Sequence, residues 1–554
     1  MLLLAWMTGC KSAPSGKHYA GVRHGGGSMA GDSESLRRTL EDRLGPGRVR
    51  GDEETLATFS MDASPYVVRP TVVVRAESEA EIAETVRVCA RFGVPITPRA
   101  GGTSLSGAAV GPGVVLDVSP CRAVLEFHSE ASTVHVQAGL PLRELTANLD
   151  PRGFFFPPDP GSADVCCIGG MIGHNSAGFR TVKYGTTASF VRSLRVVLAD
   201  GRILEAGDLA LDGPAWNQAV QRVPAIATVR EVVERHRAAI EAARRPVAKI
   251  ACGYDLFAIA EALDRGVFPL ARLFVGSEGT LGVVTEAVLG VLPKPAARVT
   301  VLLALERLED LGTLVQNLLP LGPSVMEAIA GASLRILDAA ALAVPRSAHA
   351  ILVIEFDAGD LEQLVRKTLR EASAVRLGAS PQVARDPEGQ AHLWKVRRSI
   401  LPTLLNRPGS RKPWGFVEDP VVPRDRVPEF IAFLEELTQR YETEAGIYGH
   451  IGDGNVHYRP LFDLADPEDL HRMQSMREEF DTAVLERFGG ALSAEHGIGR
   501  LRAEVLPRMW GREVWAVMRS IKEALDPQGL LNPGVLFGST PWWHGWHAIG
   551  SPRG

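Results

Sequence analysis

The sequence predicts an α+β protein with two large domains. Apolar, strand-like runs alternate with amphipathic helical segments along most of the 554 residues, a mixture typical of α+β folds. At roughly 100–200 residues per domain, a chain of this length holds several packed units. After Pro293 and Pro295 the composition shifts to helices rich in Leu and Ala, so we place the domain boundary at this proline pair.

The first domain is expected to span residues 45–295. Ser78 and Glu81 form a capping box that begins an amphipathic helix, and Gly93 ends this helix. A charged helical stretch is expected over residues 214–245, and strand alternates with turn over 273–292. Further strands are expected at residues 94–98, 114–118, 133–138 and 193–198.

The second domain is expected to span residues 296–538, where helices alternate with strands such as 351–356. A final helix is expected at residues 512–525. The tail, residues 539–554, contains three tryptophans, Trp542, Trp543 and Trp546. We expect this tail to be a disordered extension, and docking of a partner is the alternative.

Residues 1–44 are interpreted as an N-terminal extension. The first ten residues resemble a short secretion or lipoprotein leader, but no positive region precedes the brief apolar run. We therefore expect translation to start at Met29, and lipidation of Cys10 is the alternative. No run of 18 apolar residues occurs, so no transmembrane helix is expected.

Composition excludes several classes of protein. The 60 Lys and Arg residues nearly balance 65 Asp and Glu, which argues against a nucleic-acid-binding surface. Six cysteines in so long a chain exclude a disulfide scaffold, and the absence of C-x-x-C gives no support for iron–sulfur clusters or zinc ribbons. A reduced, cytoplasmic protein is expected.

Glycine is in excess: 56 of the 554 residues, about 10%, are glycine, against a usual level of roughly 7%. It is dense in three loops at residues 101–107, 161–178 and 276–282. Without a Cβ, such loops let backbone N–H groups approach a phosphate closely. A lone loop of this kind is usually a tight turn, but three together favour a large phosphorylated cofactor. None matches the Rossmann G-x-G-x-x-G pattern, so a different architecture is indicated.

These loops, with the segments at 157–161, 183–185 and 275–283, resemble the FAD-binding signatures of the vanillyl-alcohol-oxidase/p-cresol-methylhydroxylase flavoprotein superfamily. The chain is most similar to its D-2-hydroxy-acid dehydrogenase branch, which includes D-lactate dehydrogenases, the glycolate oxidase FAD subunit and D-2-hydroxyglutarate dehydrogenase. The resemblance spans residues 45–538. It implies an FAD-binding domain of two α+β subdomains and a C-terminal α+β substrate (cap) domain, with the final helix returning to the FAD domain.

The resemblance also implies which residues hold FAD. The pyrophosphate would be wrapped by Arg99, Ala100, Gly101, Gly102, Thr103 and Ser104. The ribityl chain and isoalloxazine would be lined by Asp159, Gly161, Gly170, Asn175, Ser176, Gly178 and Tyr184, with Asn532 near the ring. Gly282 and Val284 would meet the adenosine half, and Pro158, Cys167, His174 and Glu278 complete the predicted set.

His174 raises the question of covalent attachment, because some superfamily members attach FAD through a histidine. This branch usually carries a different residue there and binds FAD noncovalently, so noncovalent binding is expected.

The strongest motif is GHIGDGNVH at residues 449–457. Asp453 and Gly454 are typical of a type I′ hairpin, and counting outward from that turn makes His450 and His457 a cross-strand pair with Cβ atoms roughly 5 Å apart. Two imidazoles at this distance can share a divalent metal. A hairpin with two unliganded histidines is the alternative.

A second motif, SAEHGIG at residues 493–499, adds a carboxylate and an imidazole. The resemblance implies that His450, His457 and Glu495 are ligands of a divalent metal, expected to be zinc, and that His496 is the catalytic base. It also implies that Arg397 binds the substrate carboxylate. A surface arginine is the alternative for Arg397, and Arg398 is its adjacent rival.

Two positions depart from the hydroxyglutarate enzymes. Arg459 stands where several relatives carry a small polar residue, and Leu401 stands where those enzymes carry a hydroxyl. Arg459 could serve a second substrate carboxylate or point away from the pocket. The acidic segment at residues 418–420 resembles one found in relatives fused to iron–sulfur domains.

The expected function is FAD-dependent, metal-assisted oxidation of a D-2-hydroxy acid to the 2-oxo acid, with hydride passing to flavin N5. Candidate substrates are D-lactate-like acids, glycolate and D-2-hydroxyglutarate. Because iron–sulfur cysteines are lacking, electrons are expected to leave to an external quinone, cytochrome, electron-transfer flavoprotein or iron–sulfur subunit. The alternatives are a metal-dependent hydrolase and a flavin-binding subunit active only in a complex. A peripheral position at the inner membrane face and a homodimer are left open.

Overall fold

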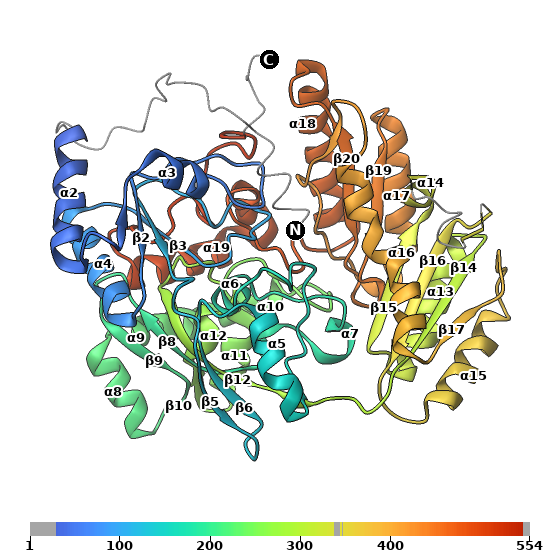
Figure 1. Ribbon diagram of the computed structural model, residues 1–554, viewed down its shortest axis with the longest axis horizontal. Coiled ribbons are helices and arrows are strands. Elements are labelled where there is room, and N and C mark those ends of the chain that lie inside the picture. The colour runs from blue at the N-terminus through green and yellow to red at the C-terminus, as the bar shows by residue number, and fades with distance from the viewer. Residues whose placement is uncertain (1–28, 337–343, 346, 547–554) are drawn as a thin grey trace.

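Three β-sheets organise the protein, two in its N-terminal half and one in its C-terminal half (Figure 1). The computed structural model describes residues 29–336, 344–345 and 347–546. The two halves lie side by side, and the expected α+β fold class is confirmed. The alternatives for the chain start, including Met29 as first residue and a lipidated Cys10, depend on residues 1–28, which lie outside the described residues.

The first sheet has the order β1-β2-β4-β3, with β2, β4 and β3 parallel. Its crossover helix α4 begins after Ser78, whose side chain accepts the Glu81 N–H, and ends at Gly93 in a left-handed conformation, as expected. Helix α2 packs its Leu36 and Leu40 into the same core. The elements are α2 (Met29–Leu44), β1 (Val49–Arg50), α3 (Glu53–Phe59), β2 (Val72–Arg75), α4 (Glu79–Phe92), β3 (Ile96–Arg99) and β4 (Val114–Asp117).

The second sheet is antiparallel, with the order β5-β6-β12-β8-β9. Its strands are β5 (Val124–His128), β6 (Thr133–Gln137), β8 (Val191–Val197), β9 (Ile203–Ala206) and β12 (Val283–Gly290). The strands expected from the sequence in both sheets are present within two residues of their expected bounds.

Helices and two short strand pairs surround this second sheet. They are α5 (Leu142–Leu149), β7 (Phe154–Phe155), α6 (Ile168–His174), α7 (Thr181–Tyr184), β10 (Asp208–Ala210), α8 (Pro214–Arg222), α9 (Ala225–Arg235), α10 (Arg237–Ala242), α11 (Leu256–Asp264), β11 (Val267–Pro269), α12 (Leu270–Phe274) and β13 (Leu292–Pro293). The single helical stretch expected at 214–245 is wrong. It is three helices: Pro224, which has no N–H to continue α8, separates α8 from α9, and His236, outside the helical conformation, separates α9 from α10.

The third sheet is a seven-stranded antiparallel sheet with the order β17-β14-β16-β15-β19-β20-β18. Both of its faces are covered. Along β14, Leu302 and Ala304 pack with the α16 side chains, whereas Val301 and Leu303 pack with those of α13 and α17. Burial on both faces explains why these strands are continuous apolar runs. The strands are β14 (Val299–Leu305), β15 (Val325–Ala330), β16 (Ala350–Phe356), β17 (Gln382–Ala384), β18 (Lys412–Pro413), β19 (Ala445–Gly449) and β20 (His457–Phe462).

The helices of the C-terminal half are α13 (Glu309–Leu318), α14 (Gly331–Ile336), α15 (Leu361–Ala372), α16 (Pro387–Leu405), α17 (Val427–Arg440), α18 (Pro467–Thr482) and α19 (Leu506–Leu525). The last of these packs against α9 of the N-terminal half, where Figure 1 shows it in red. It includes the helix expected at 512–525, and Gly511 breaks it with φ 76°.

The tryptophan tail is packed, so the expectation of a disordered extension is wrong for residues up to 546. Trp542 and Trp546 are each 3% exposed. The Trp542 ring stacks on Phe416 at 5.4 Å between centroids, and its carbonyl accepts a hydrogen bond from the Tyr66 hydroxyl. Tyr66 belongs to the N-terminal half and Phe416 to the C-terminal half, so the tail joins the two.

The described cysteines, Cys89, Cys121, Cys166, Cys167 and Cys252, are buried and unpaired, in line with a chain that is not a disulfide scaffold. None of the helices in the described part of the chain is long and apolar enough to cross a membrane.

We predict that Trp542→Ala destabilises the protein by about 3–5 kcal/mol, because it empties a buried aromatic site. The exposed neighbour His544 provides the control: His544→Ala should leave the thermal unfolding midpoint unchanged. The measurement is thermal denaturation followed by circular dichroism. Equal midpoints for wild type and Trp542→Ala would contradict the packed tail.

Candidate active site

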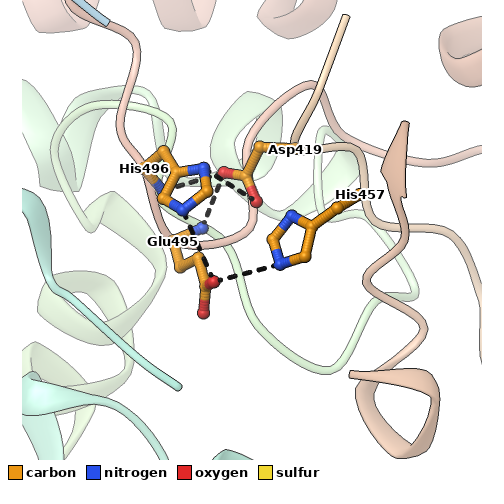
Figure 2. A group of neighbouring side chains, drawn as sticks. All are labelled: Asp419, His457, Glu495 and His496. Carbon is orange, nitrogen blue, oxygen red and sulfur yellow. Dashed lines mark hydrogen bonds and ion pairs between the residues drawn. The ribbon is translucent and has the colours of Figure 1, made fainter. Parts of the chain in front are cut away.

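The histidine and glutamate motifs meet in a buried cluster in the C-terminal half, part of which is drawn in Figure 2. His450 follows the last residue of β19, and His457 is the first residue of β20. Glu495 and His496 come from the loop before α19. The cluster therefore brings together residues that are up to 46 positions apart in the sequence.

The connection between the two histidines differs from the expected type I′ hairpin. Strands β19 and β20 pair Tyr448, not His450, with His457. Residues 451–453 form a 3-10 turn, and Gly454 follows with φ 79°. The expected register is therefore wrong, but the two imidazole rings are still 5.2 Å apart because His450 lies just beyond the strand end.

The reason is a tertiary contact that the local turn signal does not contain. The backbone of Val456 donates to the carbonyl of Pro420, and that of Val422 donates to the carbonyl of Gly454. The Asn455 side chain donates to Pro420 as well, at 3.0 Å. The turn thus pairs with the segment 420–422 in addition to its own short-range hydrogen bonds.

Three imidazoles point their Nε2 atoms at one carboxylate oxygen. The distances to Oε1 of Glu495 are 3.1 Å from His450, 3.5 Å from His457 and 3.6 Å from His496. Each Nδ1 faces outward: that of His450 to Glu327, that of His457 to the Glu418 carbonyl and that of His496 to the Glu418 carboxylate. Such outer hydrogen bonds orient imidazoles that bind metals.

This donor set fits a divalent metal. With metal–ligand bonds of about 2.0–2.2 Å, the ligand atoms of a tetrahedral site lie about 3.3–3.6 Å apart. The separations of 3.1 and 3.5 Å from Glu495 to His450 and His457 are close to this value. His450, His457 and Glu495 would hold such an ion.

Among the described residues, the four whose ligand atoms all lie within 4.8 Å of one another are Asp419, His457, Glu495 and His496 (Figure 2), a group that contains two of the three predicted ligands but not His450. We assign Asp419 to the loop and not to a metal, because both of its oxygens already accept hydrogen bonds. Oδ2 accepts from the Ser493 hydroxyl at 2.6 Å and from the three backbone N–H groups that follow it. Oδ1 accepts from Asn455 at 3.1 Å.

The surrounding charges favour a cation in the cluster. Burial alone would lower the pKa of His450, but Glu327 and Glu495 outweigh it and raise this pKa to about 9. Burial would also lower the pKa of His496, but the Glu418 carboxylate outweighs this effect and raises the pKa to about 9. Burial holds the pKa of His457 well below its usual value.

Arg397, not Arg398, faces the cluster. Its Nε donates to Oε2 of Glu327 at 2.6 Å, and its guanidinium lies over the rings of Phe179 and Tyr448, at 5.3 and 4.7 Å from their centroids. Arg397 is buried, whereas Arg398 is exposed. A surface position for Arg397 is thereby excluded.

Phe179 connects this cluster to the N-terminal half. It directly follows the loop 168–178 that is predicted to line the flavin, and its ring is 5.4 Å from that of His450. Beyond it, Lys183 and Tyr184 both bond to Asp357 of the C-terminal half. The cluster therefore lies where the two halves meet.

The three glycine loops meet one another. The N–H of Gly276 donates to Ile172, and the N–H of Glu278 donates to Gly173, at 2.9 and 2.8 Å. The side-chain amide of Asn532 donates to the carbonyls of Ala108 and Glu278. Segments that are far apart in the sequence thus form one surface.

This surface has the features of a site for a large polar ligand. A Cβ built on Gly161 or Gly170 would find no atom within 4 Å. The buried Nε2 of His174 and Oδ1 of Asn532 have no hydrogen-bond partner among the described residues. These open backbone positions and unpartnered polar atoms fit FAD. On the same loops lie Ala100, Gly101, Gly102, Thr103, Pro158, Cys167, Asn175, Ser176 and Gly178.

Several predicted cofactor residues also hold the loops in place. Arg99 donates to the carbonyls of Met61 and Ala109, and Ser104 accepts the N–H groups of Ser106 and Ala108.

Three other predicted cofactor residues contact the surrounding protein. Asp159 pairs with Arg180. Gly282 packs where a Cβ would lie 2.4 Å from Val196, and Val284 pairs with Val196 between β12 and β8.

Glu278 links the glycine loops to the loop that carries Glu495 and His496. It is buried and has φ 51°, and its two carboxylate oxygens accept the N–H groups of Ile498 and Gly499, each at 2.8 Å. The loop that carries Glu495 and His496 is therefore anchored on the FAD-binding half.

Four charged residues of the cluster were missed by the sequence analysis or given no definite role. Glu327 bonds both Arg397 and His450. Lys249 is buried and donates to Oε2 of Glu495 at 2.9 Å. Glu418 and Arg459 pair at 3.1 Å, so Arg459 is held by this acid. A glutamate inside the apolar strand β15 was the one signal that could have revealed Glu327.

Two family models match the chain, "FAD binding domain" over residues 70–207 and "FAD linked oxidases, C-terminal domain" over residues 294–536. The glycolate oxidase subunit GlcD of Bacillus subtilis is 31% identical, covering 91% of this chain and 97% of that protein. D-lactate dehydrogenase of Anaerostipes hadrus is 29% identical, covering 89% and 95%. D-2-hydroxyglutarate dehydrogenase of Escherichia coli is 30% identical, and this chain spans about half, 49%, of its length.

Solved structures show the same fold. They include 4-ethylphenol oxidase from Gulosibacter chungangensis, with a TM-score of 0.66 at 16% identity over 91% of this chain and 97% of that one. The match to p-cresol methylhydroxylase has a TM-score of 0.65 at 14% identity over 92% and 97%. The chain belongs to the FAD-linked D-2-hydroxy-acid dehydrogenase branch of the vanillyl-alcohol-oxidase/p-cresol-methylhydroxylase superfamily and is an oxidoreductase that acts on CH–OH groups.

Proposed function

We propose that this enzyme oxidises a small D-2-hydroxy acid to the 2-oxo acid and passes the electrons to an external acceptor. The observation that carries the proposal is the single buried cluster in which Arg397, three imidazoles and Glu495 face one another beside the flavin-binding loops. The relatives named for glycolate, D-lactate and D-2-hydroxyglutarate support this substrate class.

Arg397 is the binding group for the substrate carboxylate. Its Nε is held by Glu327, and its two terminal nitrogens have no acceptor among the residues that the structure describes. A carboxylate can accept two parallel hydrogen bonds from such a fork. The rings of Phe179 and Tyr448 on its faces keep the guanidinium in one plane.

The alcohol group of the substrate then lies toward the imidazoles. When bound, FAD supplies the two-electron acceptor for the hydrogen on Cα. A divalent metal at His450, His457 and Glu495, expected to be zinc, supplies Lewis acidity toward the hydroxyl when it is bound. Nε2 of His496 takes the hydroxyl proton.

The cluster favours substrates with one carboxylate. Arg459, the candidate for a second carboxylate, already bonds Glu418 at 3.1 Å and is buried with it. Leu401 contributes no hydroxyl at its position. We therefore expect D-lactate or glycolate to be better substrates than D-2-hydroxyglutarate.

The electrons must reach another molecule. The described cysteines are buried and scattered, and they offer no iron–sulfur ligand set. The acceptor is a quinone, a cytochrome, an electron-transfer flavoprotein or an iron–sulfur subunit.

The decisive test is an anaerobic substrate panel on the purified, FAD-loaded protein. D-lactate or glycolate should bleach the flavin absorbance, D-2-hydroxyglutarate should do so more slowly, and L-lactate should not. The absence of bleaching by every D-2-hydroxy acid, or equal bleaching by both lactate enantiomers, would overturn the proposal.

Removing a metal ligand should stop catalysis without releasing FAD. His450→Ala and Glu495→Gln are expected to lower the bleaching rate by more than about 100-fold, beyond the usual effect of an outer-shell change. Zinc binding by equilibrium dialysis should weaken in parallel. His128 is exposed and far from the site in sequence, so His128→Ala is the control. Normal turnover of a metal-free variant would remove the metal from the mechanism.

The role of Arg397 is tested by Arg397→Lys, which keeps the charge but loses the fork. Two charge-assisted hydrogen bonds are at stake, so we expect KM to rise about 10- to 100-fold. Arg398→Lys is the matched control at the next position and should leave KM unchanged. Similar KM values for the two variants would contradict the assignment.

A further inference from the structure

Glu418 lies on the outward side of the His496 imidazole and has no role in the function proposed above. We propose that Glu418 is a positioning residue that fixes the imidazole of His496 through Nδ1 and thereby turns Nε2 toward the substrate hydroxyl. This inference rests on the proposed function of His496 as the base.

The Glu418 side chain is fully buried and has three partners. Oε1 accepts from Nδ1 of His496 at 2.6 Å and from Arg502 at 3.2 Å, and Oε2 accepts from Arg459 at 3.1 Å. The two guanidinium groups offset the cost of burying the carboxylate. Each of its oxygens therefore has a fixed direction.

The next residue fixes the position of the imidazole. Asp419 Oδ2 accepts the N–H groups of Ala494, Glu495 and His496 at 3.0, 3.0 and 2.8 Å. Figure 2 shows Asp419 beside His496. Because Glu418 and Asp419 are neighbours in the chain, one short segment holds the backbone of His496 and also its ring.

The hydrogen bond between the two side chains decides which nitrogen of His496 faces the cluster. A carboxylate only accepts hydrogen bonds, so Nδ1 of His496 must be the donor. Nε2 then lies inside the cluster, 3.6 Å from Oε1 of Glu495. The ring also stacks on His457, with centroids 5.3 Å apart and planes 18° apart, and turning it over would break its hydrogen bond to Glu418.

Asp419 cannot take over this role. Its oxygens are occupied by the loop, and its nearest oxygen is 3.8 Å from Nδ1 of His496. Glu418 is the acid that contacts the ring directly.

The test is a double-mutant cycle on the FAD-loaded protein, followed by anaerobic stopped-flow reduction with the best substrate of the panel. Glu418→Gln should lower the limiting reduction rate by about 100-fold, as other losses of orienting hydrogen bonds do, with the substrate dissociation constant little changed. In a His496→Ala background, Glu418→Gln should cause no further loss of rate.

Asp481 provides a matched control, because it is buried and pairs with Arg477 at 2.5 Å without touching His496. Asp481→Asn should lower the thermal midpoint about as much as Glu418→Gln but leave the reduction rate unchanged. The inference is overturned if Glu418→Gln keeps the wild-type rate, if Asp481→Asn loses rate equally, or if the effects of Glu418→Gln and His496→Ala multiply.

A second measurement needs no substrate. Neutron diffraction from crystals of the FAD-loaded protein grown in heavy water should show a deuteron on Nδ1 of His496, directed at Glu418. Its absence from Nδ1 would overturn the inference even if turnover is normal. If instead no 2-hydroxy acid reduces the flavin, the proposed function fails while the deuteron still shows where Glu418 holds the hydrogen.

Discussion

The buried carboxylate of Asp419 is the contact on which the rest of the site depends. Its Oδ2 gathers the Ser493 hydroxyl and the N–H groups of the next three residues, and its Oδ1 holds Asn455. The loop with Glu495 and the turn between the histidines are thereby fixed to one segment. Loss of these donors would leave a buried carboxylate without hydrogen bonds, which would lower the free energy of unfolding by several kcal/mol. The site is therefore ordered by hydrogen bonds within the protein.

A second constraint is that the site belongs to neither half alone. Glu278 reaches from the glycine loops to the N–H groups of Ile498 and Gly499, and Phe179 lies against His450. The tail adds a contact on another side, since Trp542 joins Tyr66 to Phe416. The distance between the glycine loops and His496 is thus set by buried contacts across the junction, and small changes in the distances between reacting groups alter rates strongly.

Local patterns succeeded where the interaction is local. The cap at Ser78, the end of the helix at Gly93 and the main strands depend on neighbours in sequence, and they were predicted correctly. The hairpin register failed because Pro420 and Val422 compete for the turn's backbone groups. The prediction of a disordered tail failed because the partners of Trp542 lie far away in sequence, where no local pattern reveals them.

The sequence by itself determined the family, the order of the glycine loops and the short motifs that bring His450, Glu495 and His496 into the site, because these depend on residue type and close spacing. Only the tertiary structure decided what controls those residues. Glu327 lies on strand β15 and Glu418 in a loop of the C-terminal half, whereas Lys249 lies in a loop of the N-terminal half. Their charges tolerate burial only through partners that folding brings together, and no local pattern records such partners.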